Sequence, residues 1–315
     1  MIWLLRRIGI SILLVWAVAS IVYLAIHLVP GDPAELLLSS AGMTPNPEAI
    51  ADLRQQLGLD RPMLDQYLTS LGGLVRGDLG VSLRDGTPVA EEIARRLPRT
   101  LELLGVAGLF AAIFGIPLGT FAALQRGRTL DRALSGIASL SLAVPVFVLG
   151  TLTVMLFALQ LHWAPAGGFV PITQSLAQHL ILLAMPALTI GIGLAAIVMR
   201  MTRASILDVM QRDFIRTARA KGVGAWRILV HHMLRNAMMP VVTVLALHLG
   251  SLLGGTVLVE YVFNWPGMSG FLVDAVNARD YPEVVGVILV ISIIFVALNL
   301  IVDIVYGLLD PRVRR

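Results

Sequence analysis

Six stretches of the chain are apolar on every side and long enough to cross a lipid bilayer. They are about 20 to 25 residues long and lie at residues 8–29, 103–124, 135–159, 180–199, 237–259 and 284–308. Roughly 20 apolar residues of helix cross a bilayer core, whereas a surface helix of a soluble protein keeps a polar stripe. Backbone groups in lipid must bond to one another, so these segments should be helical. We therefore predict an all-α membrane protein with six transmembrane helices.

The first apolar segment has a second interpretation, because Arg6 and Arg7 precede it as they would in a secretory signal peptide. Its apolar run of about 22 residues exceeds the roughly 7–15 residues of a signal h-region. The run also ends at His27–Pro30 without a small-x-small cleavage site. We predict a retained transmembrane helix, with a removed signal peptide as the alternative.

The composition agrees with a membrane protein and excludes several other classes. Of 315 residues, 57% are hydrophobic and 14% are charged, with a mean hydropathy of +0.83, whereas soluble proteins carry about 25% charged residues. The absence of cysteine excludes a disulfide scaffold and any thiolate metal site or nucleophile. The net charge of +4 is too small to indicate a nucleic-acid partner.

The distribution of basic residues between alternate loops predicts the orientation. Sixteen of the 24 Lys and Arg residues lie in segments 1–7, 125–134, 200–236 and 309–315. The remaining eight lie in segments 30–102, 160–179 and 260–283. Short cytoplasmic loops carry the excess of Lys and Arg, so the first set is predicted to be cytoplasmic. Both termini are then cytoplasmic.

The predicted external segment, residues 30–102, is too long to be a simple connection and carries its own helix signals. Asn46-Pro47-Glu48 supplies a cap, a first-turn proline and a first-turn acid, and Gly58 ends the apolar pattern that follows. Gly77-Asp78-Leu79-Gly80 is typical of a turn. We predict a folded external element lying against the membrane; a disordered loop is the alternative.

The predicted cytoplasmic loop 200–236, called the basic loop below, holds eight basic residues. Gly222 is a candidate helix C-cap, with Arg219 and Lys221 in the last turn before it. Residues 225–236 form a second helical stretch, so two short helices should meet at a glycine with a positive φ. Small residues at Ala218 and Ala220 would let another protein approach the backbone closely. Attraction to anionic lipid is the alternative role.

Short blocks along almost the whole chain resemble the dipeptide/oligopeptide/nickel permease family of ABC importers. The stretches 216–222 and 234–240 resemble the coupling loop of such membrane subunits. Further blocks follow in family order: Gly31-Asp32-Pro33, residues 57–62, 77–80, 96–101, Gly254-Gly255-Thr256, residues 264–267, 279–282 and 309–312. The long external segment after the first helix resembles the B-type subunit rather than its C-type partner.

The resemblance implies a type I ABC importer permease in a bacterial cytoplasmic membrane, without catalytic residues or a cofactor of its own. Such a subunit pairs with a homologous C-type permease, two ATPase subunits that bind ATP and Mg²⁺, and a periplasmic or lipid-anchored binding protein. No Gly-x-x-x-x-Gly-Lys-Ser/Thr phosphate loop occurs in this chain. Dipeptides or oligopeptides are the implied cargo, with nickel chelates, glutathione and opines left open.

The resemblance also implies which residues meet the ATPase. The coupling residues would be Arg216, Thr217, Ala218, Arg219, Ala220, Lys221, Gly222 and Val223. The general importer motif has Glu-Ala-Ala where this chain has Arg216, Thr217 and Ala218, and its closing proline is displaced to Pro240. No role for the missing glutamate can be carried over.

Among the six apolar segments, 237–259 has the face richest in small and polar side chains. His248, Ser251, Gly255 and Thr256 lie on it and are candidates for the translocation path, with ordinary helix packing as the alternative. The six histidines are scattered without a His-x-x-x-His pair, so we predict no metal site.

Two other classes of function fit the sequence less well than the importer. A secondary transporter needs buried charges for a coupling ion, and Asp303 is the one carboxylate inside an apolar segment. Asp303 is expected to pair with an arginine near 200–203 instead. An intramembrane protease would need a motif such as His-Glu-x-x-His, which is absent. Both classes are therefore poorly supported.

The orientation can be tested with single cysteines placed in this cysteine-free chain. We expect Arg84→Cys to react with a membrane-impermeant thiol reagent on intact cells and Arg216→Cys to react only after the cells are opened. Labelling of the 216 variant but not the 84 variant on intact cells would reverse the topology.

Overall fold

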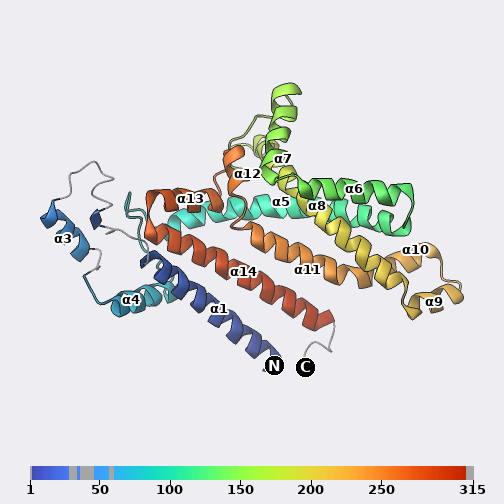
Figure 1. Ribbon diagram of the computed structural model, residues 1–315, viewed down its shortest axis with the longest axis horizontal. Coiled ribbons are helices and arrows are strands. Elements are labelled where there is room, and N and C mark those ends of the chain that lie inside the picture. Colours follow the sequence, from blue (N-terminus) through green and yellow to red (C-terminus); the bar gives the residue numbers. More distant parts are fainter. Residues whose placement is uncertain (1, 28–33, 36–45, 57–59, 310–315) are drawn as a thin grey trace. The chain divides into compact units, whose positions relative to one another are not determined.

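The structure, a computed structural model, describes residues 2–27, 34–35, 46–56 and 60–309, and all of their longer elements are helical (Figure 1). The α-helices are α1 (Ile2–His27), α3 (Pro47–Gln56), α4 (Met63–Val75), α5 (Val89–Leu124), α6 (Thr129–Ala143), α7 (Val146–Thr153), α8 (Leu176–Met210), α9 (Asp213–Ala220), α10 (Ala225–Arg227), α11 (Arg235–Leu252), α12 (Val257–Val262), α13 (Met268–Ala278) and α14 (Tyr281–Leu309). Val154–Gln160 and Ile228–Leu234 are π-helical. Among the described residues a single β-bridge, Val81 to Pro88, is the extent of sheet pairing. The predicted all-α class is confirmed.

Five stretches of helix within the described residues are long and apolar enough to cross a membrane. They are Leu5–Ala25, Val89–Leu124, Leu176–Met210, Ala225–Leu252 and Tyr281–Ile304. A sixth span arises if Thr129–Ala143 and Val146–Gln160, which meet at a bend of 99°, count as one. The predicted segments therefore fall on these helices or on the bent pair, except that 237–259 extends past the end of α11 at Leu252.

The bend in the predicted segment 135–159 has a local cause in Pro145. Val144 before it is extended, with φ −84° and ψ 125°, because the proline ring disfavours a helical residue at that position. Pro117, Pro186 and Pro240, in contrast, lie within continuous helices. Of these four prolines, Pro145 alone interrupts a helix.

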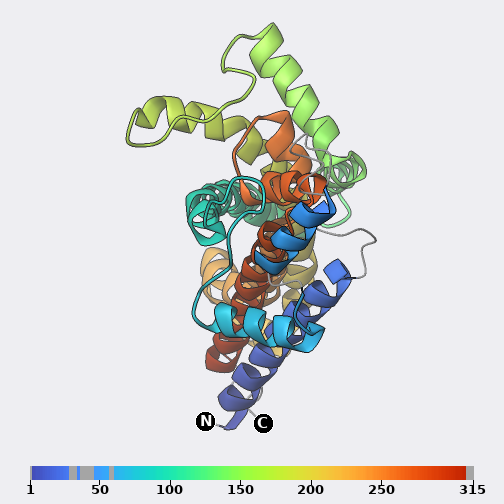
Figure 2. The same cartoon turned by 90° about the vertical axis from the view of Figure 1, so that its left-hand side faces the viewer.

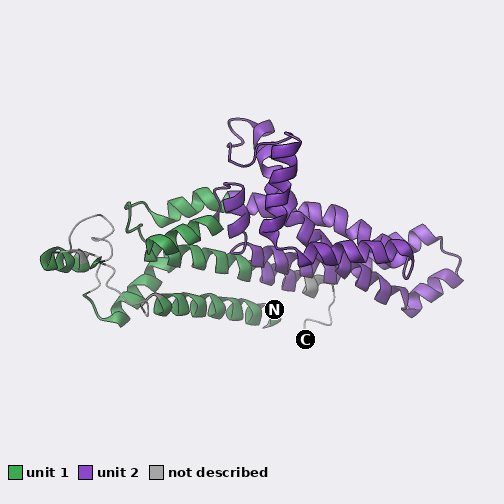
Figure 3. Ribbon diagram, turned by 45° about the horizontal axis from the view of Figure 1, so that its top comes forward, with its two compact units in different colours: residues 1–98, 268–297 green, residues 99–267, 298–315 purple. Residues whose placement is uncertain are grey.

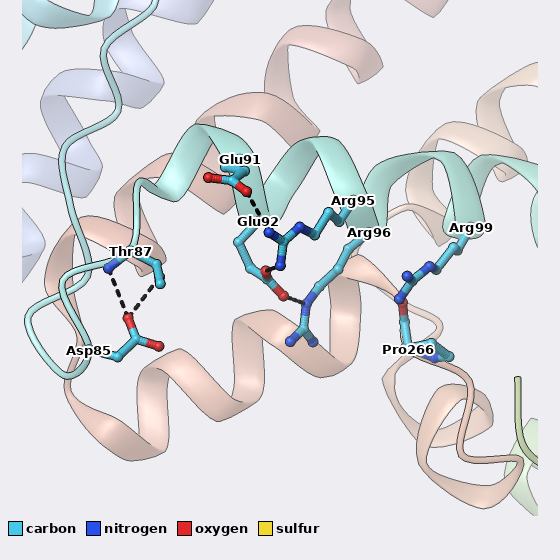
Figure 4. A network of polar contacts seen from close by, with 8 residues as sticks. All are labelled: Asp85, Thr87, Glu91, Glu92, Arg95, Arg96, Arg99 and Pro266. Atoms are coloured by element: carbon cyan, nitrogen blue, oxygen red, sulfur yellow. Dashed lines mark hydrogen bonds and ion pairs between the residues drawn. The ribbon is translucent and has the colours of Figure 1, made fainter. Parts of the chain in front are cut away.

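Two of the helices run well beyond the predicted apolar segments. α5 begins at Val89 rather than at residue 103. Its first turns bury Val89 and Ile93 against α13 and α14, and Glu91 pairs with Arg95 and Glu92 with Arg96 one helical turn apart (Figure 4). α8 continues to Met210, through the first part of the basic loop. An apolar window detects neither extension, since both are rich in charge.

The chain divides into two compact units (Figure 3): residues 1–98 with 268–297, and residues 99–267 with 298–315. In the first unit, α4 lies across α1 (Figure 2), with the Ser20 and Tyr67 hydroxyls 2.6 Å apart. A small core joins α5, α13 and α14 through Val89, Phe271 and Val287.

The predicted external segment contains the folded pieces that its sequence indicated. The Asn46 side chain accepts a hydrogen bond from the Glu48 backbone N–H (3.3 Å), and Gly77 and Gly80 both have positive φ. The 81–88 turn is held by Ser82, whose hydroxyl donates to Asp280 (2.6 Å). Thr87 donates twice to Asp85, which holds the pKa of Asp85 below its ordinary value (Figure 4). The predicted signals at residues 31–33, 57–59 and 310–312 lie outside the described residues.

In the second unit, α8 is the helix against which the others pack. α5, α6, α7 and α11 all contact it, and buried side chains from α5, α8, α11 and α12 form one apolar core. α5 approaches most closely at Gly115 and Gly119. A Cβ atom at Gly115 would lie 2.8 Å from the Ala195 carbonyl oxygen, and one at Gly119 would lie 2.4 Å from that of Met199. Two glycines four residues apart therefore let the backbones of α5 and α8 approach closely.

Gly119→Ala should destabilise the protein, because its methyl group would overlap the α8 backbone and force the helices apart. Overpacking of this kind costs about 1–3 kcal/mol, so we expect a lower thermal unfolding midpoint in detergent. The control is Gly105→Ala on the same helix, where a Cβ atom meets nothing within 4 Å. Equal midpoints for the two variants would show that the close approach carries no energetic weight.

Candidate functional site

The basic loop contains a tightly built turn at the end of α9. The Val223 N–H donates to the Ala218 carbonyl (3.2 Å), the Gly222 N–H donates to the Arg219 carbonyl (3.0 Å), and Gly222 has φ +74°. These two hydrogen bonds and the positive φ define a Schellman motif, which needs glycine at this position. The predicted positive φ at Gly222 is confirmed, and so is the second helical stretch, which begins at Ala225.

One face of α9 packs into the protein and the other is open. Ile215 and Ala218 are buried in a cluster with Ile206 of α8, Ala123 of α5 and Met233. Of the eight predicted coupling residues, Ala218 is buried and Val223 half-buried, while Arg216, Thr217, Arg219, Ala220, Lys221 and Gly222 are exposed. Most of the predicted residues therefore lie on one small exposed surface. The buried face of α9, which packs against α8 and α5, holds this surface in place.

Two exposed aromatic side chains near this surface were not singled out from the sequence. Phe214 is 44% exposed and Trp226 is 76% exposed. Trp226, Arg219 and Val223 line a cavity of about 490 Å³. A bulky aromatic residue within a basic, non-membrane stretch was the available signal, because such a residue has little apolar surface to bury locally.

A second cavity, of about 320 Å³, brings together all four predicted path residues. His248, Ser251, Gly255 and Thr256 all line it. The opposite wall comes from the α6–α7 bend, including Pro145, and from Thr189 and Gly193 of α8. Hydroxyl groups and apolar side chains dominate, and His248 is the one ionisable side chain among the described lining residues.

The predicted segment 237–259 placed all four path residues on one helix. The structure places them on two elements. α11 ends at Leu252, a turn follows, and Thr256 precedes α12. The Gly254-Gly255 pair explains the interruption, since each glycine costs about 1 kcal/mol relative to alanine inside a helix. Two elements rather than one therefore form this wall.

Thr256 is held by a buried carboxylate that the sequence did not single out. Its hydroxyl donates to Glu260 Oε1 (2.9 Å), and Glu260 is 2% exposed. Thr100 of α5 also donates to this oxygen (3.4 Å). A Cβ atom on Gly267 would lie 2.2 Å from it, so the loop 264–267 packs directly over the carboxylate.

The loop 264–267 is fixed in turn by the beginning of this unit's part of α5. The Trp265 indole N–H donates to the Arg99 carbonyl (3.2 Å), and the Arg99 guanidinium contacts the Pro266 carbonyl (3.5 Å; Figure 4). The resemblance included residues 264–267, and their packing over Glu260 gives them a structural role.

Arg203 of α8 forms an ion pair that differs from the expected one. Its guanidinium binds both carboxylate oxygens of Asp131 on α6, at 2.6 and 2.8 Å. The expectation that Asp303 pairs with an arginine near 200–203 is not met by Arg203. The two partners are 72 residues apart in the sequence, and no local pattern connects them.

Comparisons with known proteins agree with these features. Residues 115–315 match the family of binding-protein-dependent transport system inner membrane components, and residues 1–104 match the N-terminal family of such membrane components. The glutathione transport system permease protein GsiC of Escherichia coli O6:H1 is 44% identical over 297 residues, 94% of each chain. The dipeptide transport system permease protein DppB of Escherichia coli K12 is 38% identical over 338 aligned positions, covering 99% of this chain and 98% of that protein.

A solved structure shows the same fold. A chain of the inward-facing MetNI methionine ABC transporter superposes with a TM-score of 0.54 at 22% identity, covering 68% of this chain and 95% of that one. The sequence match spans nearly the whole length of both permease relatives, and the family model covers most of the chain. This protein belongs to the family of binding-protein-dependent transport system inner membrane components, as a permease subunit of an ABC importer.

Proposed function

We propose that the chain translocates dipeptides or oligopeptides across the bacterial cytoplasmic membrane as the B-type subunit of an ATP-driven importer, with both termini cytoplasmic. The single observation that carries this is the match to the dipeptide permease along 99% of the chain. Glutathione is the alternative cargo, because the glutathione permease is similar over 94% of the chain. Both cargoes are small peptides.

The proposal includes a set of partners. The chain would pair with a homologous C-type permease, bind two ATPase subunits and receive cargo from an external binding protein. It would bind membrane lipid but no nucleic acid. ATP and Mg²⁺ would reside on the ATPase subunits, so this chain has no catalytic role and holds no cofactor.

The exposed face of α9 and the Gly222 turn would form the contact with an ATPase subunit. Small side chains let a partner reach the backbone, while Phe214 and Trp226 are aromatic anchors of the kind that dominate protein interfaces. The buried face of α9 supports this role, because Ile215 and Ala218 pack against α8 and α5. A force on the exposed face would therefore pass to transmembrane helices rather than bend a loose loop.

The cavity lined by His248, Ser251, Gly255 and Thr256 would form this subunit's share of the translocation path. Its hydroxyl groups can exchange hydrogen bonds with peptide groups, each worth only about 0.5–1.5 kcal/mol net. Weak, uncharged contacts suit a passage, since cargo must leave as readily as it enters.

Gly222→Trp should abolish ATP-driven uptake of a labelled dipeptide into proteoliposomes that hold the complete complex. The side chain would strain a backbone with φ +74° and hold the two proteins apart. We expect membrane insertion and delivery by the binding protein to persist. Unlabelled glutathione in the same assay shows which peptide the wild-type complex prefers.

The matched control for this variant is Gly77→Trp. Gly77 has φ +79° and follows α4 with the same pair of hydrogen bonds, Gly77 N–H to Leu74 and Asp78 N–H to Gly73. The local strain is thus equal, but the residue lies in the predicted external segment. Equal loss of uptake in both variants, or normal uptake in the Gly222 variant, would remove the coupling role from the α9 turn.

Gly193→Phe tests the translocation path. Gly193 lines the cavity on α8, and a Cβ atom there meets nothing within 4 Å, so the ring can enter the open space without disturbing the fold. We expect strongly reduced uptake while ATP hydrolysis still responds to loaded binding protein. Gly136→Phe on α6, where a Cβ atom is equally free, is the control. Wild-type uptake by the Gly193 variant would mean that cargo passes elsewhere.

A further inference from the structure

The ion pair between Asp131 of α6 and Arg203 of α8 is reinforced by further hydrogen bonds to the same carboxylate. Arg203 Nε lies 2.6 Å from Asp131 Oδ1 and its Nη2 lies 2.8 Å from Oδ2. The Gly127 N–H also donates to Oδ2 (2.9 Å), and the Ser135 hydroxyl lies 3.4 Å from Oδ1. Asp131 is 3% exposed. A two-pronged pair with this support fixes both distance and orientation, which a single hydrogen bond does not.

The ion pair links the helix that leads into the α9 turn with a helix whose far end forms part of the cavity wall. Arg203 is on α8, which ends at Met210 just before α9 begins at Asp213. Asp131 is in the first turn of α6, whose other end reaches the bend at Pro145. Ser141, Leu142 and Val144 near that bend line the cavity. α6 is thus a lever of about 22 Å, at 1.5 Å per residue, with the ion pair at one end and the cavity wall at the other.

Apolar side chains also join the two helices. In one small cluster Ala138 and Leu134 of α6 meet Ala196 and Met199 of α8. Among the described residues, Asp131–Arg203 is the one side-chain hydrogen-bonded link between these two helices. Apolar contacts of this kind have no fixed direction, so the ion pair is the directional link between α6 and α8 at this end.

We propose that Asp131 and Arg203 are positioning residues that transmit movement of the α9 turn, through α8, to α6 and the cavity wall. Movement of α8 at its α9 end would carry Asp131 with it. The helix α6 would then move as one piece and rotate relative to α7 about Pro145, because the helix is interrupted there. This inference rests on the proposed function, because it assigns the α9 turn to the ATPase contact and the cavity to the path.

The test measures how many ATP molecules the reconstituted complete complex hydrolyses for each labelled dipeptide imported. Asp131→Asn removes the charge, and Arg203→Lys keeps the charge but cannot form the two-pronged contact. We expect both variants to raise the ratio of ATP hydrolysed to cargo imported between about twofold and thirtyfold, the range such couplings span. The double variant should be no worse than the poorer single one, because each change breaks the same link.

Thr202→Val is the matched control. Thr202 neighbours Arg203 on α8, is fully buried, and its hydroxyl has no hydrogen-bond partner among the described residues. The variant changes the same turn of α8 without touching the ion pair, so its ratio should equal that of the wild type. Arg203→Lys keeps the test informative if Asp131→Asn folds poorly, since a positive charge remains beside the buried Asp131.

Two results would overturn the proposal. One is an unchanged ratio in Arg203→Lys and Asp131→Asn. The other is a parallel fall of uptake and ATP hydrolysis that matches the loss of folded protein, which is what a purely structural pair would give. Failure of the proposed function looks different, because then the wild-type complex itself would show no ATP-driven peptide uptake.

Discussion

The close approach of α5 to α8 is the contact on which the second unit depends. At Gly115 and Gly119 the two helix backbones are so near that no side chain fits between them. In lipid the hydrophobic effect does not drive helices together, so close van der Waals packing at small residues must do so. α8 in turn carries the basic loop at its end and one wall of the cavity along its length. Both candidate sites are therefore positioned by α8, which packs closely against α5 at Gly115 and Gly119.

The apolar pattern predicted where the membrane helices lie but not where they begin and end. Lipid requires apolar side chains only within the bilayer, and a helix can continue beyond it wherever charged side chains support one another. Glu91 and Glu92 do this for α5 by pairing with Arg95 and Arg96. The interruptions followed local chemistry instead: Pro145 breaks one segment, and Gly254-Gly255 ends another early.

The candidate sites were predictable to the extent that they depend on local conformation. Gly222 could be identified because a helix C-cap has a sequence signature, and the path residues could be identified as a polar face on an apolar segment. Asp131–Arg203 and Thr100–Glu260 join residues 72 and 160 positions apart, so a single sequence cannot reveal them. Trp226 had a local signal, as a bulky aromatic residue in a basic stretch, but its exposed fraction depends on how α10 packs and is seen only in the structure.

The two candidate sites differ in chemistry, as expected of a permease subunit whose partner subunits would hydrolyse ATP. The α9 face is basic, rigid and held from behind by a buried apolar cluster, which suits a surface that receives force. The cavity wall has hydroxyl groups and one histidine, and it is built across helix breaks at Pro145 and Gly254-Gly255. A helix break costs backbone hydrogen bonds, but it lets one piece of a wall move without unfolding the next. The continuous helices therefore lie at the α9 face, where an ATPase subunit would push. The interrupted helices lie at the cavity wall, where the translocation path would have to change shape.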